Sequence, residues 1–123
     1  MNIPGRRIMH GEEIFTDYFA RGGDGIILRA QVIDGSSSAT PKLDIKIDIQ
    51  TKSSESTSTP TALGSTLTLD AETPGQLKTV VVSPGASTGA NQQLRLKIST
   101  ADGAAGEWGA IRIFPPIFFN AAT

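Results

Sequence analysis

Apolar and polar residues alternate most regularly in residues 42–51, KLDIKIDIQT. Every second position is leucine or isoleucine, namely Leu43, Ile45, Ile47 and Ile49. Because successive side chains of an extended strand point to opposite faces, this period of two predicts a strand with one buried face and one solvated face. Burial of four such side chains contributes about 6 to 12 kcal/mol before chain entropy is subtracted, at about 1.5 to 3 kcal/mol each. The rest of the chain is therefore expected to cover this strand.

The same alternation recurs in several other segments. In residues 25–34, GIILRAQVID, Ile27 and Ile33 interrupt the polar face, which predicts partial cover on both sides. Further strands are predicted at residues 12–18, 65–69, 77–82, 93–100 and 108–114. No window of ten or more residues has the i, i+3, i+4, i+7 apolar spacing of a helix. We therefore predict an all-β protein, an antiparallel β-sandwich of seven to eight strands with little helix, in jelly-roll or another Greek-key order.

Turn-forming residues connect these strands. The RGGDG segment at residues 21–25 predicts a turn whose glycines adopt positive φ. The Asp-Gly pair at residues 102–103 predicts a hairpin between the last two strands. Residues 52–61, KSSESTSTPT, contain no apolar side chain, so we expect a solvated loop there.

A chain of 123 residues is long enough for one domain with its own core. We expect residues 12–119 to form this single β-sandwich domain and residues 120–123 to form a C-terminal tail. Residues 1–11 are expected to be an N-terminal arm, because Pro4 and Gly5 disfavour regular structure.

The composition excludes several kinds of chemistry. There is no cysteine and one histidine, so disulfides and a redox pair are excluded, and a zinc site would depend on carboxylates. The net charge of -1 gives no overall field that attracts nucleic acid or an anionic membrane, and we expect neither as a partner. The first residues contain no apolar run of the length that a signal peptide requires, and no membrane span is expected.

One short motif matches a catalytic pattern. Residues 85–89, GASTG, fit G-x-S-x-G with Ser87 as the serine. That motif requires a strand, a turn and then a helix, whereas a strand pattern follows here, and the only histidine, His10, precedes the serine. We expect a loop at this motif and no catalytic residue. His10 could titrate near neutral pH as a switch or simply hydrogen-bond to the backbone.

Acidic residues are the remaining candidates for binding a cation. They are Asp44, Asp48, Glu55, Asp70, Asp102 and Glu107. No D-x-D-x-D-G run arranges their oxygens as a calcium loop does, so we expect these side chains to be solvated. We predict no metal and no cofactor.

The few aromatic residues define a possible sugar-binding surface. Sugar rings stack on exposed aromatic side chains, and the chain has only Trp108, Tyr18 and five phenylalanines for this role. Trp108 opens a strand after a glycine-rich turn, where it could fill the core or form a surface platform. Filling the core is favoured, because a large aromatic side chain is rarely fully exposed.

The C-terminal stretch IFPPIFF, residues 113–119, is the most apolar part of the chain outside the regular strands. Three of the five phenylalanines fall within it. A small domain cannot easily bury all of Ile117, Phe118 and Phe119 along with its own core, so we expect an apolar patch that contacts another chain. The alternative is that the segment folds back on the sandwich. Together with the arm, the predicted protein interface comprises Ile3, Arg6, Arg7, Ile8, Met9, Pro115, Pro116, Ile117, Phe118 and Phe119.

This layout of alternating strands such as KLDIKIDIQT and QLRLKIST, a Ser/Thr-rich loop, an arm and an apolar C-terminus resembles small β-sandwich virion proteins of tailed bacteriophages, in particular head-decoration or capsid-accessory proteins. The resemblance implies a non-enzymatic structural protein of the virion, assembled in the host cytoplasm. It also implies that many copies bind capsid or other virion proteins, and a homo-oligomer. The alternatives are a surface-displayed carbohydrate-binding or adhesive module and, third, a small hydrolase that uses Ser87.

Overall fold

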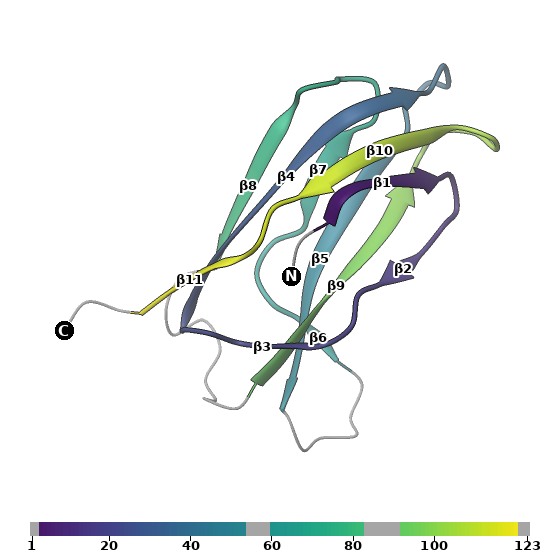
Figure 1. Ribbon diagram of the computed structural model, residues 1–123. Helices are drawn as coiled ribbons and strands as arrows, with labels where there is room; N and C mark the ends of the chain where they lie inside the picture. The colour runs from purple at the N-terminus through teal and green to yellow at the C-terminus, as the bar shows by residue number, and fades with distance from the viewer. Residues whose placement is uncertain (1–2, 54–59, 83–91, 121–123) are drawn as a thin grey trace.

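Two antiparallel sheets pack face to face in the computed structural model, which describes residues 3–53, 60–82 and 92–120 (Figure 1). Sheet A contains β1 (Ile3–Met9), β4 (Gly25–Ser36), β8 (Leu77–Val82), β10 (Trp108–Ile113) and β11 (Ile117–Phe119). Sheet B contains β2 (Ile14–Phe15), β3 (Phe19–Ala20), β5 (Asp44–Ser53), β6 (Thr61–Ala62), β7 (Leu67–Asp70) and β9 (Gln92–Ala101). The predicted all-β sandwich is confirmed.

The strand order is that of a jelly roll. β10 and β11 follow one another along the same side of β4, β2 and β3 lie along β9, and β6 and β7 lie along β5. With each of these pairs counted as one position, sheet A has the order β1, β10/β11, β4, β8, and sheet B has the order β2/β3, β9, β5, β6/β7. These two orders are those of two interlocked Greek keys. The described strands number eleven rather than the predicted seven to eight, because three of the eight positions are divided into two short strands.

The core lies between the sheets and consists of the alternate residues that face inward. β5 pairs with β9 over its whole length and with β6 and β7 on its other side, so it is central in sheet B. Its inward side chains Ile45 and Ile47 have no exposed surface, and Ile49 has 2%. The predicted buried face of residues 42–51 is therefore confirmed. The buried face of residues 25–34 is confirmed in the same way by Ile26, Leu28, Ala30 and Val32.

The N-terminal segment is a strand of the sandwich, contrary to the predicted irregular arm. β1 pairs antiparallel with β10, and its register shifts between Ile3 and Arg6. Pro4 and Gly5 occupy this irregularity, where a missing ladder hydrogen bond is tolerated because β1 is an edge strand. The prediction failed because Pro4 and Gly5 disrupt a central strand but not the edge of a sheet.

The connection between β9 and β10 is not the predicted hairpin. Asp102 and Gly103 do adopt positive φ, at 57° and 73°, as an Asp-Gly turn requires. However, β9 belongs to sheet B and β10 to sheet A, so this turn crosses from one sheet to the other. Of the segment predicted as one strand at residues 12–18, only β2 is a strand, and β3 follows it outside that segment.

Candidate protein interface

The C-terminal segment folds back onto sheet A as β11. Its three residues pair with the beginning of β4, so that Ile117 lies opposite Ile27 and Phe118 opposite Ile26. Phe118 packs against the hydrophobic core, whereas Ile117 points outward and is 44% exposed. Of the two arrangements considered for this segment, the structure has the folded-back one, and it leaves the apolar side chain of Ile117 on the surface.

Glycines beside β11 provide the space for its two aromatic rings. A Cβ atom on Gly22 would lie 2.8 Å from Cδ2 of Phe118, and a Cβ atom on Gly25 would lie 2.3 Å from Cζ of Phe119. The RGGDG segment was expected to need glycine for positive φ, but neither of these glycines has it. They are required for close approach instead, so the expected role of this turn was wrong.

The outer face of sheet A carries a row of apolar side chains from three strands. Val81 of β8, Ile27 of β4 and Ile117 of β11 lie directly opposite one another across the sheet. Val81 is 55% exposed and Ile117 is 44% exposed, while Ile27 between them is partly buried. We call these three residues the apolar row. Exposed aliphatic side chains that are cross-strand neighbours form a contiguous patch, and such patches mark interaction surfaces.

A cationic group lies next to the apolar row. Arg29 is two residues from Ile27 on β4, so its side chain leaves the same face of the sheet. Its guanidinium lies 5.2 Å from the ring centre of Phe114, and that of Arg112 lies 5.9 Å from the same ring. The Nε atom of Arg29 is buried without a hydrogen-bond partner among the described residues. An unsatisfied buried donor is costly, and an acceptor supplied by another molecule would remove that cost.

The structure distributes the predicted interface residues of β1 differently. Ile8 has no exposed surface and belongs to the core, so its assignment to the interface was wrong. Ile3 packs against the same core, whereas Arg6, Arg7 and Met9 are exposed. The prediction failed at Ile8 because the segment was taken as an arm, whereas pairing with β10 turns this side chain inward.

The remaining predicted interface residues and Trp108 lie at the surface of sheet A. Pro115 is exposed and Pro116 partly buried in the link between β10 and β11. Trp108 is half-buried rather than a core residue, and the guanidinium of Arg7 lies 4.1 Å from its ring centre. Phe119 is also half-buried.

The carboxylate of Glu107 joins the β4–β5 and β9–β10 connections at one end of the sandwich. It accepts hydrogen bonds from the backbone N–H groups of Ser38, Ala39 and Ala104, and from the hydroxyl of Ser37. The hydrogen bond from Ser38, followed by those from the other donors, outweighs burial and lowers the pKa of Glu107 to about 2. All of these donors belong to the protein itself, so the carboxylate of Glu107 holds the two connections together.

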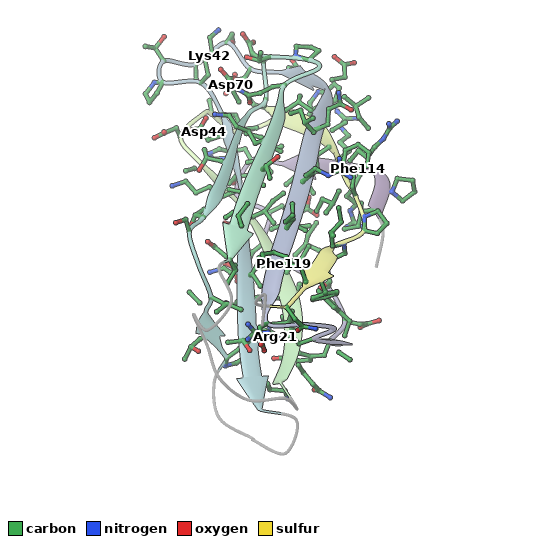
Figure 2. The ribbon with its side chains drawn as sticks, turned by 90° about the vertical axis from the view of Figure 1, so that its left-hand side faces the viewer. Arg21, Lys42, Asp44, Asp70, Phe114 and Phe119 are labelled. Atoms are coloured by element: carbon green, nitrogen blue, oxygen red, sulfur yellow. The ribbon has the colours of Figure 1, made fainter. Side chains whose placement is uncertain are left out.

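The other acidic candidates do not form a metal centre in the described part of the chain. Asp44 lies opposite Asp70 in the sheet, and Figure 2 shows both near Lys42 at one end of the molecule. Burial raises the pKa of Asp44, and the charges of Asp102 and Asp70 raise it further. No group of three or more His, Cys, Asp or Glu among the described residues is arranged to hold a metal ion. Glu55 lies outside the described residues.

The candidate catalytic motif cannot be placed. Residues 85–89, with Ser87, lie outside the described residues. His10 is exposed, and its backbone N–H donates to the carbonyl oxygen of Glu107. Among the described residues there is no helix with the length and apolar character that a membrane span requires.

Comparison with protein-family models, with curated proteins and with solved structures gave no match to this chain. The class of the protein is therefore defined by the fold, a jelly-roll β-sandwich, and by the surface of sheet A. Sequence analysis missed Val81 and Arg29 as members of this surface. The signal that could have indicated it was Ile27, which interrupts the polar face of its strand.

Proposed function

We propose that this chain is a non-enzymatic structural protein of a virion, a capsid decoration or accessory protein that binds the assembled head through the outer face of sheet A. The observation that carries the proposal is the apolar row of Val81, Ile27 and Ile117, with the unsatisfied Nε of Arg29 beside it. An apolar centre flanked by arginine is the composition typical of the core of a protein–protein interface.

The fold is consistent with this role. Jelly rolls occur in viral capsid domains as well as in lectins, although a fold alone does not determine function. The link between β10 and β11 carries Pro115 and Pro116, which have no N–H to offer and fix their own φ, so β11 is presented on a stiff connection. A rigid, preformed surface loses little entropy on binding, which suits a protein that adds to an already assembled lattice.

The first test is whether the chain belongs to particles. Particles of the phage that encodes this chain, purified on a density gradient, should contain it in a fixed ratio to the shell protein when measured by quantitative mass spectrometry. Its absence from such particles would overturn the proposal.

The second test identifies the surface. Particles stripped of the chain should rebind the recombinant protein, and Val81→Glu combined with Ile117→Glu should abolish rebinding, because two charges would be buried without partners. Thr68→Glu is the matched control, since Thr68 of β7 faces solvent on the opposite sheet, and this variant should rebind normally. Deletion of the C-terminal segment is a poorer test because it also removes Phe118 from the core.

A further inference from the structure

The outer face of sheet B carries a cluster of aromatic and cationic side chains far from the surface discussed above. We call it the Arg95 cluster. Its members come from β2, from the link between β2 and β3, from β5 and from β9, and the strands β2, β9 and β5 lie side by side in Figure 1. They are Phe15, Tyr18, Gln50, Lys52 and Arg95.

Three contacts hold the guanidinium of Arg95 in place. Its Cζ atom lies 4.1 Å from the ring centre of Phe15 and 5.2 Å from that of Tyr18. Its Nε atom donates a hydrogen bond of 2.8 Å to Oε1 of Gln50, the residue directly opposite on β5. Stacking on aromatic rings and a fixed Nε–H orient the plane of the guanidinium before any ligand binds.

The cluster is rich in hydrogen-bond donors that no described residue accepts from. Among the described residues, no acceptor is bonded to the two terminal nitrogens of Arg95, and Lys52 forms no ion pair. The Nζ atom of Lys52 instead lies 4.3 Å from the ring centre of Tyr18. Phe15 remains 42% exposed although Arg95 covers part of its ring. The site thus combines two cations with apolar ring surface that solvent can reach.

Two acidic side chains on this face of sheet B are engaged with other groups. Glu13 forms an ion pair with Lys97, at 3.6 Å between Oε2 and Nζ. Asp48 accepts a hydrogen bond from the hydroxyl of Thr66. Asp44 lies at the opposite end of β5 from Lys52, so this face of sheet B is acidic at one end and basic at the other. The Arg95 cluster itself contains two cations and no carboxylate, although the whole chain has a net charge of -1.

We propose that the Arg95 cluster binds an acidic glycan, a sugar chain whose units carry carboxylates. The terminal nitrogens of Arg95 match a carboxylate in bidentate geometry, and Lys52 adds a second charge-assisted hydrogen bond. The C–H face of the sugar ring packs against the exposed ring of Phe15, and the amide of Gln50 donates to a hydroxyl. This site goes beyond the proposed assembly function, and the two surfaces lie on different sheets, so a head-bound copy keeps sheet B free to contact a glycan.

Binding is measured by NMR titration of the full chain with trigalacturonate as the carboxylated probe and maltotriose as the neutral probe. Trigalacturonate should bind saturably and shift the amides of β5 and β9 around Gln50 and Arg95, while maltotriose should bind at least about tenfold more weakly, since a charged hydrogen-bonded pair is lost. Arg95→Gln should lose trigalacturonate binding, and Arg95→Lys should not restore it, because lysine lacks the planar fork.

Lys46→Gln is the matched control. Lys46 points to the same side of β5 as Gln50, and its replacement removes one positive charge, as Arg95→Gln does, but at a distance from the cluster. It should bind as the unaltered chain does. Phe15→Leu is a second variant that keeps apolar volume but removes the aromatic ring, and it should weaken binding without changing the urea midpoint. Equal affinity for maltotriose, unaltered binding by Arg95→Gln, or no binding of trigalacturonate at millimolar concentration would each overturn the proposal. Equal affinity for triglutamate would also overturn it and would identify the site as one for acidic peptides. None of these results bears on rebinding to particles, which is governed by sheet A.

Discussion

Replacing Gly25 with alanine tests whether the ring of Phe119 lies against the backbone of β4. The added Cβ atom would lie 2.3 Å from Cζ, 2.4 Å from Cε2 and 2.6 Å from Cε1 of that ring. These distances are far inside van der Waals contact, so the ring must move. Because Phe119 follows Ile117 by two residues on β11, its displacement would also disturb the apolar row.

The size of the effect follows from two opposing terms. Glycine to alanine restricts the unfolded chain and by itself stabilises the fold by about 0.4 to 1 kcal/mol. Inserting a methyl group into an occupied site costs about 1 to 3 kcal/mol. Gly5→Ala provides the matched comparison, because its Cβ atom would meet only Cδ1 of Ile33 at 3.5 Å, and Gly5 has no positive φ. The unfolded-state term cancels between the two variants, so Gly25→Ala should be about 1 to 3 kcal/mol less stable than Gly5→Ala.

Urea unfolding followed by tryptophan fluorescence measures this difference, and a double-mutant cycle assigns it to the ring. In a Phe119→Ala background the overlap no longer exists, so Gly25→Ala should cost no more there than Gly5→Ala. A coupling free energy near zero between Gly25 and Phe119 would refute the placement of β11 on β4.

Three further predictions concern the core and the loops. Ile47→Asp should unfold the domain, because Ile47 has no exposed surface and the new charge would be buried without a partner. Circular dichroism should show this loss of structure in Ile47→Asp but not in Lys46→Asp, which changes a residue on the solvated face. The folded-state pKa of Glu107 is lowered from 4.5 to about 2, so its stabilising effect is fully present above pH of about 4.5 and is lost as the pH falls toward 2. Urea midpoints from pH 2 to 7 should show this loss in the unaltered chain and much less of it in Glu107→Gln. Burial raises the pKa of Asp44, so its charge disfavours the folded state above that pKa. Asp44→Asn should therefore raise the urea midpoint slightly at pH 7 and leave particle rebinding unchanged.

The buried faces were predictable because they depend on local alternation alone. A side chain such as Ile47 is buried whichever strand pairs with its own, because apolar and polar residues alternate along its own strand. Edge position, in contrast, is not a local property. Pro4 and Gly5 predicted an irregular arm, but an edge strand with a bulge accommodates both. The Asp-Gly turn at residues 102–103 has the backbone conformation that its sequence predicts, yet the same local geometry serves a crossing between sheets.

The candidate surfaces were less predictable, because each depends on the register between strands that are distant in the sequence. Val81, Ile27 and Ile117 are neighbours only once β8 and β11 have paired with opposite sides of β4. Sequence analysis singled out the C-terminal aromatic residues only as an apolar stretch outside the regular strands. Phe118 packs against the core and Phe119 lies at the surface because consecutive residues of a strand point to opposite faces. The two prolines before these residues argued against a strand at this position.

The position of β10 within sheet A has a consequence for how the chain folds. β10 is hydrogen-bonded to β1 on one side and to β4 on the other, yet it comes after both of them in the sequence. During synthesis β1 and β4 therefore lack their shared partner strand until residues 108–113 leave the ribosome. Pairings of such large sequence separation fold slowly and leave strand edges exposed meanwhile. We expect the yield of folded protein to depend on chaperones that shield β1 and β4 before the last strands are made.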